Sequence, residues 1–476
     1  MISLVNVPNK YPLINSRTPP IGIGYICSYL KSKGINSVIF DFDIFPLSII
    51  KSVEIILNSN PKIVGFTCYS QNYFIIKKFC EIIKKKRPDV ITVIGGPAAS
   101  FAFDDILSDT SYIDLCVIGE GEKTLEEIYN KYNGKKDELY NIKGIAFKNN
   151  EKIIVTPKRP LITKLDEIPS PYLSEVFDLK YYSQMNISTS RGCPMKCIYC
   201  VCGAMFGAIR FHSPKRVLDE VDYIYESNLK LKWSNDNFLF NFTDDTFTYS
   251  DKHVNLILDG LEERNYKINW SATTRIMSIS EELLIRMKKV GLKMVNFGLE
   301  SADPYILKIL NKLNSKDDSL GLENKFLKRF KDIVIFSRKL GLDVFISYIL
   351  RNPYETKEMA QKTIKLCLVL DRKFGAKYIP NILVPFKGTK LYKDSKNYNI
   401  EIDKDPEFLL PYYIKKHPFI NINDLVEIFP YNHRFFIHDE IYNKSAIHFK
   451  KINAKSYYIS NNLFRKQMIR KFLKKN

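Results

Sequence analysis

Short apolar runs alternate with helical patterns over the first 135 residues, and this alternation constrains the fold more than any other feature of the chain. The runs lie at Ile2–Val5, Ser37–Asp41, Lys62–Thr67, Ile91–Ile94 and Asp114–Ile118. Between them, segments such as Tyr73–Lys85 and Glu122–Tyr132 carry apolar residues at helical spacing. Short continuous apolar runs are typical of parallel strands that are covered on both faces. The alternation therefore predicts a doubly wound, Rossmann-like α/β domain over residues 1–135.

Small and polar residues collect where these predicted strands end. They are Thr67, Ser70, Gly95, Gly96, Pro97, Gly119, Glu120 and Gly121. Ligands of open α/β sheets bind at the carboxyl ends of the strands, and glycine lets the backbone approach a ligand closely. Glycine also makes ordinary turns, so the spacing alone leaves both interpretations open. No GxGxxG follows the first strand, which disfavours a dinucleotide.

A second β/α series begins near residue 186, after a connector. Residues 136–185 predict a hairpin that turns on Asn149 and Asn150, followed by the proline-marked segment LDEIPSPYL. Six further strands are predicted at Asn186–Ser190, Phe238–Thr243, Lys267–Ala272, Lys293–Leu299, Asp343–Leu350 and Lys377–Leu383. Six β/α units predict an open partial barrel over residues 186–395, with its site at the carboxyl ends of the strands.

Four of the nine cysteines crowd into ten residues, in the segment RGCPMKCIYCVC. They are Cys193, Cys197, Cys200 and Cys202. Zinc sites usually pair two short cysteine hooks, and no second hook is visible here. Three closely spaced thiolates instead suit three corners of an iron–sulfur cluster, which leaves one iron open to a small molecule. Cys202 follows Cys200 by only two residues, and we interpret it as a neighbour of the site rather than a ligand.

At this point the sequence resembles a known family. The spacing C-x3-C-x2-C, with Tyr199 before the last cysteine and an RG dipeptide before the first, is similar to the signature of radical S-adenosylmethionine (SAM) enzymes. Downstream, FTDDTF, TTRI, GLESAD and VPFKGTKLY fall at the expected strand ends. Upstream, TPPIGIGYICSYLKSKG, VIGGPAAS and VIGEGEKTLEEI resemble the cobalamin-binding domain that precedes the barrel in one large class of these enzymes.

The resemblance implies three cofactors, namely a 4Fe–4S cluster, SAM and cobalamin. Cys193, Cys197 and Cys200 would hold the cluster, whose open iron would chelate SAM, and the small residues of the first domain would bind cobalamin. Electron transfer to SAM would yield a 5′-deoxyadenosyl radical that removes a hydrogen from the substrate. Tyr199 would lie along the adenine, and further SAM contacts are expected from Asp244, Asp245, Arg275 and Glu300. Such residues also cap helices or pair with one another, so a structural role stays open for each, and no catalytic residue is assigned.

The sequence also departs from the family pattern in two places. Where the family often has LGLPGET, this chain has LRNPYET, so that Arg351 and Tyr354 replace two glycines. In the GTxLY segment, Lys387 stands where proline is common. These changes leave the expected fold intact but put the adenine pocket and the substrate mouth in doubt.

The absence of histidine from residues 1–211 bears on the predicted reaction. The first histidine is His212, so the D-x-H-x-x-G arrangement that gives cobalt a histidine ligand is missing. A weakly ligated cobalt transfers methyl more readily, and we therefore expect a methyltransferase that acts on an unactivated carbon. The alternatives are a non-methylating cyclase, epimerase or oxidase, a methylthiotransferase, and a sensor that keeps cobalamin and cluster without turnover.

Charge concentrates at the C-terminal end. The chain carries 72 Lys and Arg against 52 Asp and Glu, for a formal net charge of +20, and residues 441–476 hold no acidic residue. These residues belong to a C-terminal extension over 396–476 whose basic tail shows helical spacing. We favour a terminal helix docked by its apolar stripe over a clamp on an acidic partner. The cofactor signatures account for most of the chain without nucleic acid, which is disfavoured as a partner.

Location and further partners follow from what the sequence lacks. No apolar run approaches the roughly 18–20 residues of a membrane helix, and the N-terminus shows no basic leader before an apolar core. Nine cysteines are an odd number, which argues against a disulfide framework. We therefore expect a cytoplasmic protein with a small-molecule or peptide substrate and an electron donor such as flavodoxin or ferredoxin.

Overall fold

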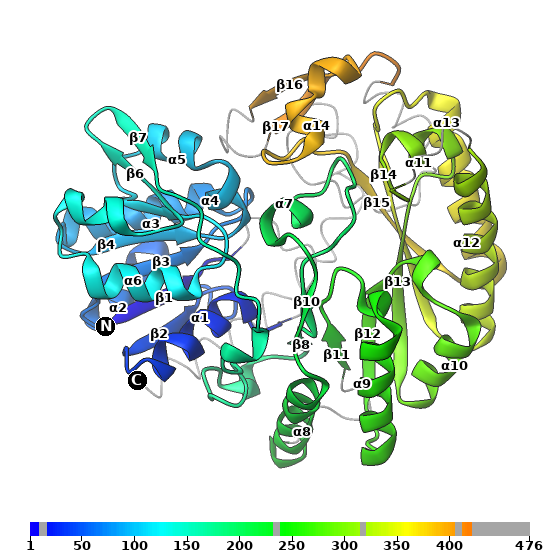
Figure 1. Ribbon diagram of the computed structural model, residues 1–476, viewed down its shortest axis with the longest axis horizontal. Coiled ribbons are helices and arrows are strands. Elements are labelled where there is room, and N and C mark those ends of the chain that lie inside the picture. The colour runs from blue at the N-terminus through cyan, green and yellow to red at the C-terminus, as the bar shows by residue number, and fades with distance from the viewer. Residues whose placement is uncertain (9–16, 232–238, 315–319, 405–411, 421–476) are drawn as a thin grey trace.

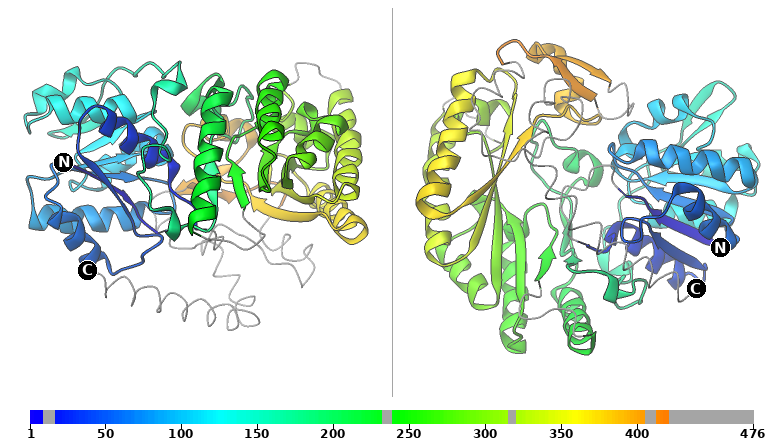
Figure 2. Two further views of the ribbon diagram at one scale, coloured as in Figure 1. Left: turned by 90° about the horizontal axis from the view of Figure 1, so that it is seen from below. Right: turned by 180° about the vertical axis from the view of Figure 1, so that it is seen from behind.

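The computed structural model describes residues 1–8, 17–231, 239–314, 320–404 and 412–420. These residues form two parallel sheets, each flanked by helices, that face one another across the molecule (Figure 1, Figure 2). The basic tail helix predicted within residues 441–476 lies outside the described residues.

The first sheet has the doubly wound arrangement that the sequence predicts. Its strand order is β2-β1-β3-β4-β5-β6-β7, and the first five strands are parallel. These strands are β1 (Ile2–Asn6), β2 (Ser37–Asp41), β3 (Ile63–Thr67), β4 (Ile91–Gly95) and β5 (Leu115–Val117). Both faces are covered by α1 (Ile21–Ser32), α2 (Ile49–Asn58), α3 (Tyr73–Lys86), α4 (Pro97–Phe101), α5 (Phe103–Asp109) and α6 (Glu122–Lys131). The order reverses between β1 and β3, which is where such sheets bind ligands.

The predicted hairpin forms but does not belong to a separate connector. Strands β6 (Ile145–Asn149) and β7 (Lys152–Val155) turn on Asn150, whose φ of 51° is left-handed. Strand β6 pairs antiparallel with β5. The first sheet therefore extends past residue 135, where the sequence predicted the domain to end, because local periodicity does not show which edge a hairpin joins.

The second sheet confirms the predicted partial barrel. Its order is β15-β14-β13-β12-β11-β8, and every neighbouring pair is parallel. The strands are β8 (Met185–Ile187), β11 (Leu239–Phe242), β12 (Asn269–Thr274), β13 (Leu292–Glu300), β14 (Asp343–Leu350) and β15 (Lys377–Ile382). Its outer face is covered by α8 (Pro214–Leu231), α9 (Asp251–Arg264), α10 (Glu281–Lys289), α12 (Gly321–Lys339) and α13 (Lys357–Phe374). Two short helices, α11 (Pro304–Ile309) and α14 (Lys390–Lys393), follow strand ends.

The first barrel strand breaks in two, unlike the single strand expected at Asn186–Ser190. After β8, the chain leaves the sheet and forms β9 (Ser190–Arg191), which pairs antiparallel with β10 (Arg210–Phe211). This short ladder closes the segment 192–209 into a loop, which we call the cysteine loop, and we call the β9–β10 ladder its neck. The loop contains α7 (Cys202–Phe206).

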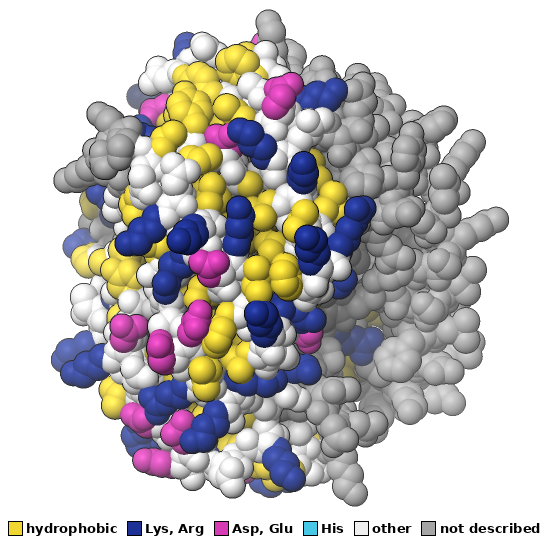
Figure 3. All heavy atoms as spheres, turned by 90° about the vertical axis from the view of Figure 1, so that its right-hand side faces the viewer, with side chains coloured by type: hydrophobic (Ala, Val, Ile, Leu, Met, Phe, Trp, Pro, Cys, Tyr) yellow, Lys and Arg dark blue, Asp and Glu magenta, His cyan; other side chains and the backbone are white. Residues whose placement is uncertain are grey.

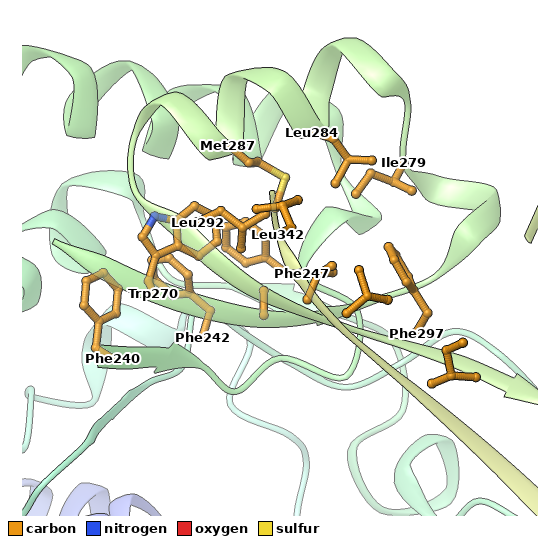
Figure 4. Packing of buried hydrophobic residues seen from close by; sticks show 14 of the residues in the cluster. Phe240, Phe242, Phe247, Trp270, Ile279, Leu284, Met287, Leu292, Phe297 and Leu342 are labelled. Carbon is orange, nitrogen blue, oxygen red and sulfur yellow. The ribbon is translucent and has the colours of Figure 1, made fainter. Parts of the chain in front are cut away.

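Aromatic and aliphatic side chains pack together in the core between the barrel sheet and its helices (Figure 4). Phe242 stacks on Phe247 with ring centroids 4.7 Å apart, and Trp270 meets Phe242 edge-on at 5.2 Å. The Trp270 indole N–H donates to the Val290 carbonyl at 2.8 Å, so its one polar atom is satisfied inside the core. Close packing of this kind holds the strands rigidly and thereby fixes the positions of the loops at their ends.

Three further observations concern the C-terminal region, the surface and the helices. The hairpin of β16 (Glu401–Lys404) and β17 (Tyr412–Lys416) forms in a tract whose sequence shows no clear period. On the face shown in Figure 3, Lys and Arg side chains are interspersed with acidic and hydrophobic ones. Among the helices that the structure describes, none has the length and apolar character to span a bilayer.

Candidate active site

A cavity of about 420 Å³ lies between the two domains and is lined by residues of both. Seven of the eight residues predicted to bind cobalamin line it, namely Thr67, Gly95, Gly96, Pro97, Gly119, Glu120 and Gly121. From the barrel side come Ser188, Ser190, Arg191, Gly192, Met205, Phe206, Thr243 and Asp245. The eighth predicted residue, Ser70, lines a second cavity of about 220 Å³ that shares Tyr69 and Pro97 with the first. We call the two the large and the small cavity.

Glycine turns form the first-domain wall of the large cavity. Gly96 has φ of +93°, and a Cβ there would lie 3.0 Å from the Cys68 carbonyl oxygen, so only glycine fits without strain. Ser100 joins two of these turns, since its hydroxyl donates to the Gly96 carbonyl at 2.9 Å and accepts from the Gly119 N–H at 3.0 Å. The backbone at this wall is thus held in place for close approach by a ligand.

Glu120 lines the same cavity, but its carboxylate is already engaged. Oε1 lies 3.2 Å from Arg191 Nη1 and 2.9 Å from Arg210 Nη1, while Oε2 accepts from the Ile162 N–H at 2.8 Å. Glu120 is therefore part of an ion cluster that connects the first domain to the neck of the cysteine loop. Its predicted contact with cobalamin stays a prediction.

The cysteine loop presents three thiols that suit an iron–sulfur cluster. Cys193 and Cys197 are half-buried, Cys200 is exposed, and none forms a disulfide. Burial raises the pKa of Cys193 above its usual range. The Cys202 N–H donates to Cys200 Sγ at 3.4 Å, a contact of the kind that tunes cluster thiolates. Three thiols are the donor set that three corners of an iron–sulfur cluster require. Within the described residues, however, no three His, Cys, Asp or Glu side chains lie close enough together to hold a metal ion.

Cys202 is occupied differently from the other three cysteines of the loop. It is buried, and its thiol donates to Asp245 Oδ2 at 2.7 Å. Burial first, and then the Asp245 carboxylate, raise the pKa of Cys202 far above its usual range. This contact agrees with the interpretation of Cys202 as a neighbour of the cluster site, and it fixes Asp245 beside the loop.

The two adjacent aspartates have separate positions. Asp244 is buried and accepts from the Thr189 N–H at 3.2 Å, from the Thr189 hydroxyl at 2.8 Å and from the Ser190 hydroxyl. Burial raises the pKa of Asp244 to about 6. Asp244 therefore holds the break between β8 and β9, whereas Asp245 lines the large cavity. Of these two aspartates, only Asp245 lines either of the two cavities.

Tyr199, Arg275 and Glu300 meet around a lysine that the sequence did not single out. Lys312 Nζ lies 2.7 Å from Glu300 Oε1, and both side chains are buried. The Arg275 guanidinium donates to the Lys312 carbonyl. Burial first, and then the nearby Glu300 carboxylate, raise the pKa of Tyr199 well above its usual range. These residues are brought together but line neither cavity, and no motif marks Lys312.

The ion pair between Glu300 and Lys312 explains the glycine at position 298 in GLESAD. Glu300 has φ of +62°, and a Cβ on Gly298 would lie 2.4 Å from Glu300 Oε1 and 2.8 Å from Lys312 Nζ. Any larger side chain at 298 would collide with the ion pair. The motif thus makes room for a buried carboxylate.

The departures from the family pattern retain a glycine-like backbone. Arg351 and Tyr354 have φ of +61° and +62°, in the left-handed region that glycine adopts without strain. The Tyr354 hydroxyl donates to the Asn397 carbonyl at 2.7 Å, which holds the side chain in place. At the other departure, Lys387 lies 2.7 Å from both Asp104 Oδ2 and Asp105 Oδ2 and so connects the barrel to α5.

Comparison with known proteins identifies both halves of the chain. The B12 binding domain family matches residues 14–129, and the radical SAM superfamily matches residues 187–367. An uncharacterized methyltransferase of Pyrococcus horikoshii is 31% identical over 387 residues, which are 80% of this chain and 79% of that protein. The anaerobic magnesium-protoporphyrin IX monomethyl ester cyclase of Rubrivivax gelatinosus is 27% identical, over 73% of this chain and 61% of its own length.

A solved structure shares the fold. The cobalamin-dependent SAM radical enzyme OxsB, with aqua-cobalamin and SAM bound, superposes with a TM-score of 0.70 at 16% identity. The match covers 89% of this chain and 65% of OxsB. The chain therefore belongs to the radical SAM enzymes that carry a cobalamin-binding domain, and its cofactors are a 4Fe–4S cluster, SAM and cobalamin.

Proposed function

We propose that this enzyme transfers a methyl group from SAM to an unactivated carbon of its substrate. The observation that carries the proposal is the large cavity, which is lined both by the glycine turns of the first domain and by residues flanking the cysteine loop. When bound, the cluster and SAM supply a hydrogen-abstracting radical and cobalamin supplies the methyl group. One cavity shared by both domains lets a substrate carbon meet both the radical and the methyl donor.

The residues of the chain position these groups and shield them from water. Apolar side chains line much of the large cavity, including those of Ile21, Ile26, Met205 and Phe206. Such a lining excludes water, which would otherwise quench reactive intermediates. Asp245 offers a carboxylate acceptor on the barrel side, held by the Cys202 thiol at 2.7 Å. We assign Cys193, Cys197 and Cys200 to the cluster, with Tyr199, Asp245 and Glu300 beside SAM.

A non-methylating reaction is the alternative, and the cyclase of Rubrivivax gelatinosus is the specific observation in its favour. This chain spans 61% of the length of that relative. A cyclase, epimerase or oxidase would use the cysteine loop in the same way but would not need the methyl donor. The two proposals therefore differ in what becomes of the SAM methyl group.

We also propose a small-molecule or peptide substrate and a flavodoxin or ferredoxin as electron donor. All nine cysteines are free thiols. Free thiols and an oxygen-sensitive cluster suit a reducing compartment such as the cytoplasm.

The test follows both halves of SAM. The full chain is reconstituted without oxygen with iron, sulfide and hydroxocobalamin, reduced, and given SAM with a trideuterated methyl group and a small-molecule cell extract. A methyltransferase yields 5′-deoxyadenosine and S-adenosylhomocysteine together with a product that carries the trideuteromethyl group. Formation of 5′-deoxyadenosine without S-adenosylhomocysteine supports the non-methylating alternative. Absence of 5′-deoxyadenosine in the presence of the substrate overturns both, and Cys197→Ala provides the blank.

A further inference from the structure

The two ends of the cysteine loop are connected to the first domain through one carboxylate. Arg191 and Arg210 face each other across the neck as partners in the β9–β10 ladder. Their side chains are 12% and 10% exposed, and both reach Glu120 Oε1, at 3.2 Å and 2.9 Å. Glu120 lies just after β5 of the first sheet, 71 and 90 residues before them in the chain.

Additional contacts surround this junction. Arg191 Nη2 lies 2.8 Å from Glu122 Oε1, and the Arg191 guanidinium lies 4.9 Å from the centre of the Tyr25 ring. Arg210 also donates to the Ile162 carbonyl at 2.6 Å and to the Phe206 carbonyl at 3.3 Å. We call Glu120, Glu122, Arg191 and Arg210 the clasp. Its charges are buried and balanced, and removal of one partner from a buried pair is strongly destabilising because the other charge loses its compensation.

The clasp is shared between two sites. Glu120, Glu122 and Arg191 line the large cavity. Arg191 is followed by Gly192, which has φ of +99° and where a Cβ would lie 2.8 Å from the Ala208 carbonyl oxygen. The two ends of the loop are therefore in contact, and Cys193 comes next. Because the two ends of the loop are in contact, displacement of Glu120 or Arg191 by an occupant of the large cavity must move the loop that carries the thiols.

We propose that the clasp is a positioning device through which cobalamin in the large cavity and SAM at the cysteine loop strengthen each other's binding. Glu120 acts as a positioning residue rather than only as part of the cavity wall. Coupling between two sites is reciprocal, so SAM tightens cobalamin by the same factor by which cobalamin tightens SAM, commonly about 5- to 150-fold. The inference concerns binding alone and holds whichever reaction follows.

The test measures this factor without turnover. The full chain, loaded with cluster and kept without reductant so that SAM is not cleaved, is titrated with hydroxocobalamin with and without saturating SAM. We expect SAM to tighten hydroxocobalamin about fivefold or more in the wild type and less than about twofold in Glu120→Gln. Because the factor is a ratio, loss of a direct contact between Glu120 and cobalamin cancels out.

A matched control variant shows whether the effect depends on the contacts of Glu120 with the neck. Glu127→Gln makes the same change in the neighbouring helix α6, and Glu127 also pairs with an arginine, Arg159, but does not contact the neck. This variant is expected to keep the wild-type factor. If Glu120→Gln fails to fold or to load iron, the same titration is done on Arg210→Lys. The lysine ammonium keeps the charge but cannot reach Glu120, Ile162 and Phe206 together. A wild-type factor below about twofold, or an undiminished factor in either variant, overturns the proposal.

Discussion

At the scale of single residues, the four cysteines of one loop have unequal surroundings. Cys202 is buried and its thiol donates a hydrogen bond to Asp245, whereas Cys193 and Cys197 are half-buried and Cys200 is exposed. We predict that replacing any one of these three by alanine removes more than about half of the iron, because each ligand contributes to holding the cluster. Iron and sulfide per chain after anaerobic reconstitution provide the measurement.

The same measurement separates ligands from neighbours. Cys202→Ala is expected to keep most of the iron, as is Cys367→Ala, whose thiol is buried in α13. Iron loss in Cys202→Ala equal to that in Cys197→Ala would show that Cys202 is a ligand and that the assignment of the three is wrong.

A second prediction at this scale concerns Lys312. With Glu300 it forms a pair at 2.7 Å in which both side chains are at most 10% exposed. Lys312→Met leaves a buried carboxylate without its partner, and we expect a loss of about 3–5 kcal/mol in the free energy of unfolding. Urea unfolding of the two proteins gives the difference. The double variant Lys312→Met with Glu300→Gln is expected to recover much of it, and failure to do so would mean that the pair is not what stabilises this corner.

Residue pairs of this kind mark the limit of what the sequence could predict. It singled out Glu120 from its place after a strand, but the partners Arg191 and Arg210 lie 71 and 90 residues away. It could not separate Asp244 from Asp245, since both follow the same strand and only the break between β8 and β9 turns one toward Thr189. Long-range contacts carry no local periodicity, and the roles of such residues therefore require the structure.

At the scale of elements, the predictions are strongest where the apolar pattern is complete. Strands β2 (Ser37–Asp41) and β14 (Asp343–Leu350) have the predicted bounds because their apolar patterns are complete. Helix α4 (Pro97–Phe101) was not predicted, because five residues show no helical period. Its start is instead set by Gly96 in a positive-φ conformation.

The junction between α4 and the segment after β15 leads to a third prediction. Gly388 has φ of +91°, and a Cβ there would lie 2.2 Å from the Phe101 ring. Gly388→Ala therefore combines left-handed strain of roughly 1–2 kcal/mol with overpacking of roughly 1–3 kcal/mol. Gly341 has φ of +80°, and a Cβ there would have no atom within 4 Å, so Gly341→Ala carries the strain alone. Equal destabilisation of the two variants in urea would contradict the proposed steric contact.

The loop after β14 leads to a fourth prediction, on pH. Glu355 is buried and accepts from the Asn352 N–H at 3.0 Å, and burial raises its pKa to about 8. The folded state therefore keeps a proton that the unfolded chain loses near its ordinary pKa of 4.5, and stability falls as pH rises toward 8. Between pH 6.5 and 8 the expected loss is about 2 kcal/mol.

The neighbouring titrations act in another window. Burial lowers the pKa of His417 and His212 to about 4 and raises that of Asp41 to about 6, so these groups change stability mainly below pH 6.5. Glu355→Gln is expected to flatten the dependence between pH 6.5 and 8, as measured by urea midpoints. An unchanged slope in this variant would show that a group other than Glu355 causes the pH dependence of stability.

At the scale of the whole molecule, half of the net charge of +20 lies in residues 441–476, beyond every described residue of the two cavities. Deletion of this segment is expected to lower the salt concentration that elutes the protein from a cation-exchange resin, since fewer positive charges then hold the protein to the resin against screening by salt. Binding of SAM and hydroxocobalamin should stay unchanged. Weaker binding of either would show that the segment takes part in the site.

The two sheets are also segregated along the chain. Every strand of the first sheet comes from residues 2–155, and every strand of the second from residues 185–382, so neither sheet borrows a strand from the other. Domains of this kind fold as units during synthesis, the N-terminal one first. We therefore expect the Glu120 carboxylate to be in place on the folded first domain when Arg191 and Arg210 leave the ribosome. The nascent cysteine loop would then dock on a surface that is already folded.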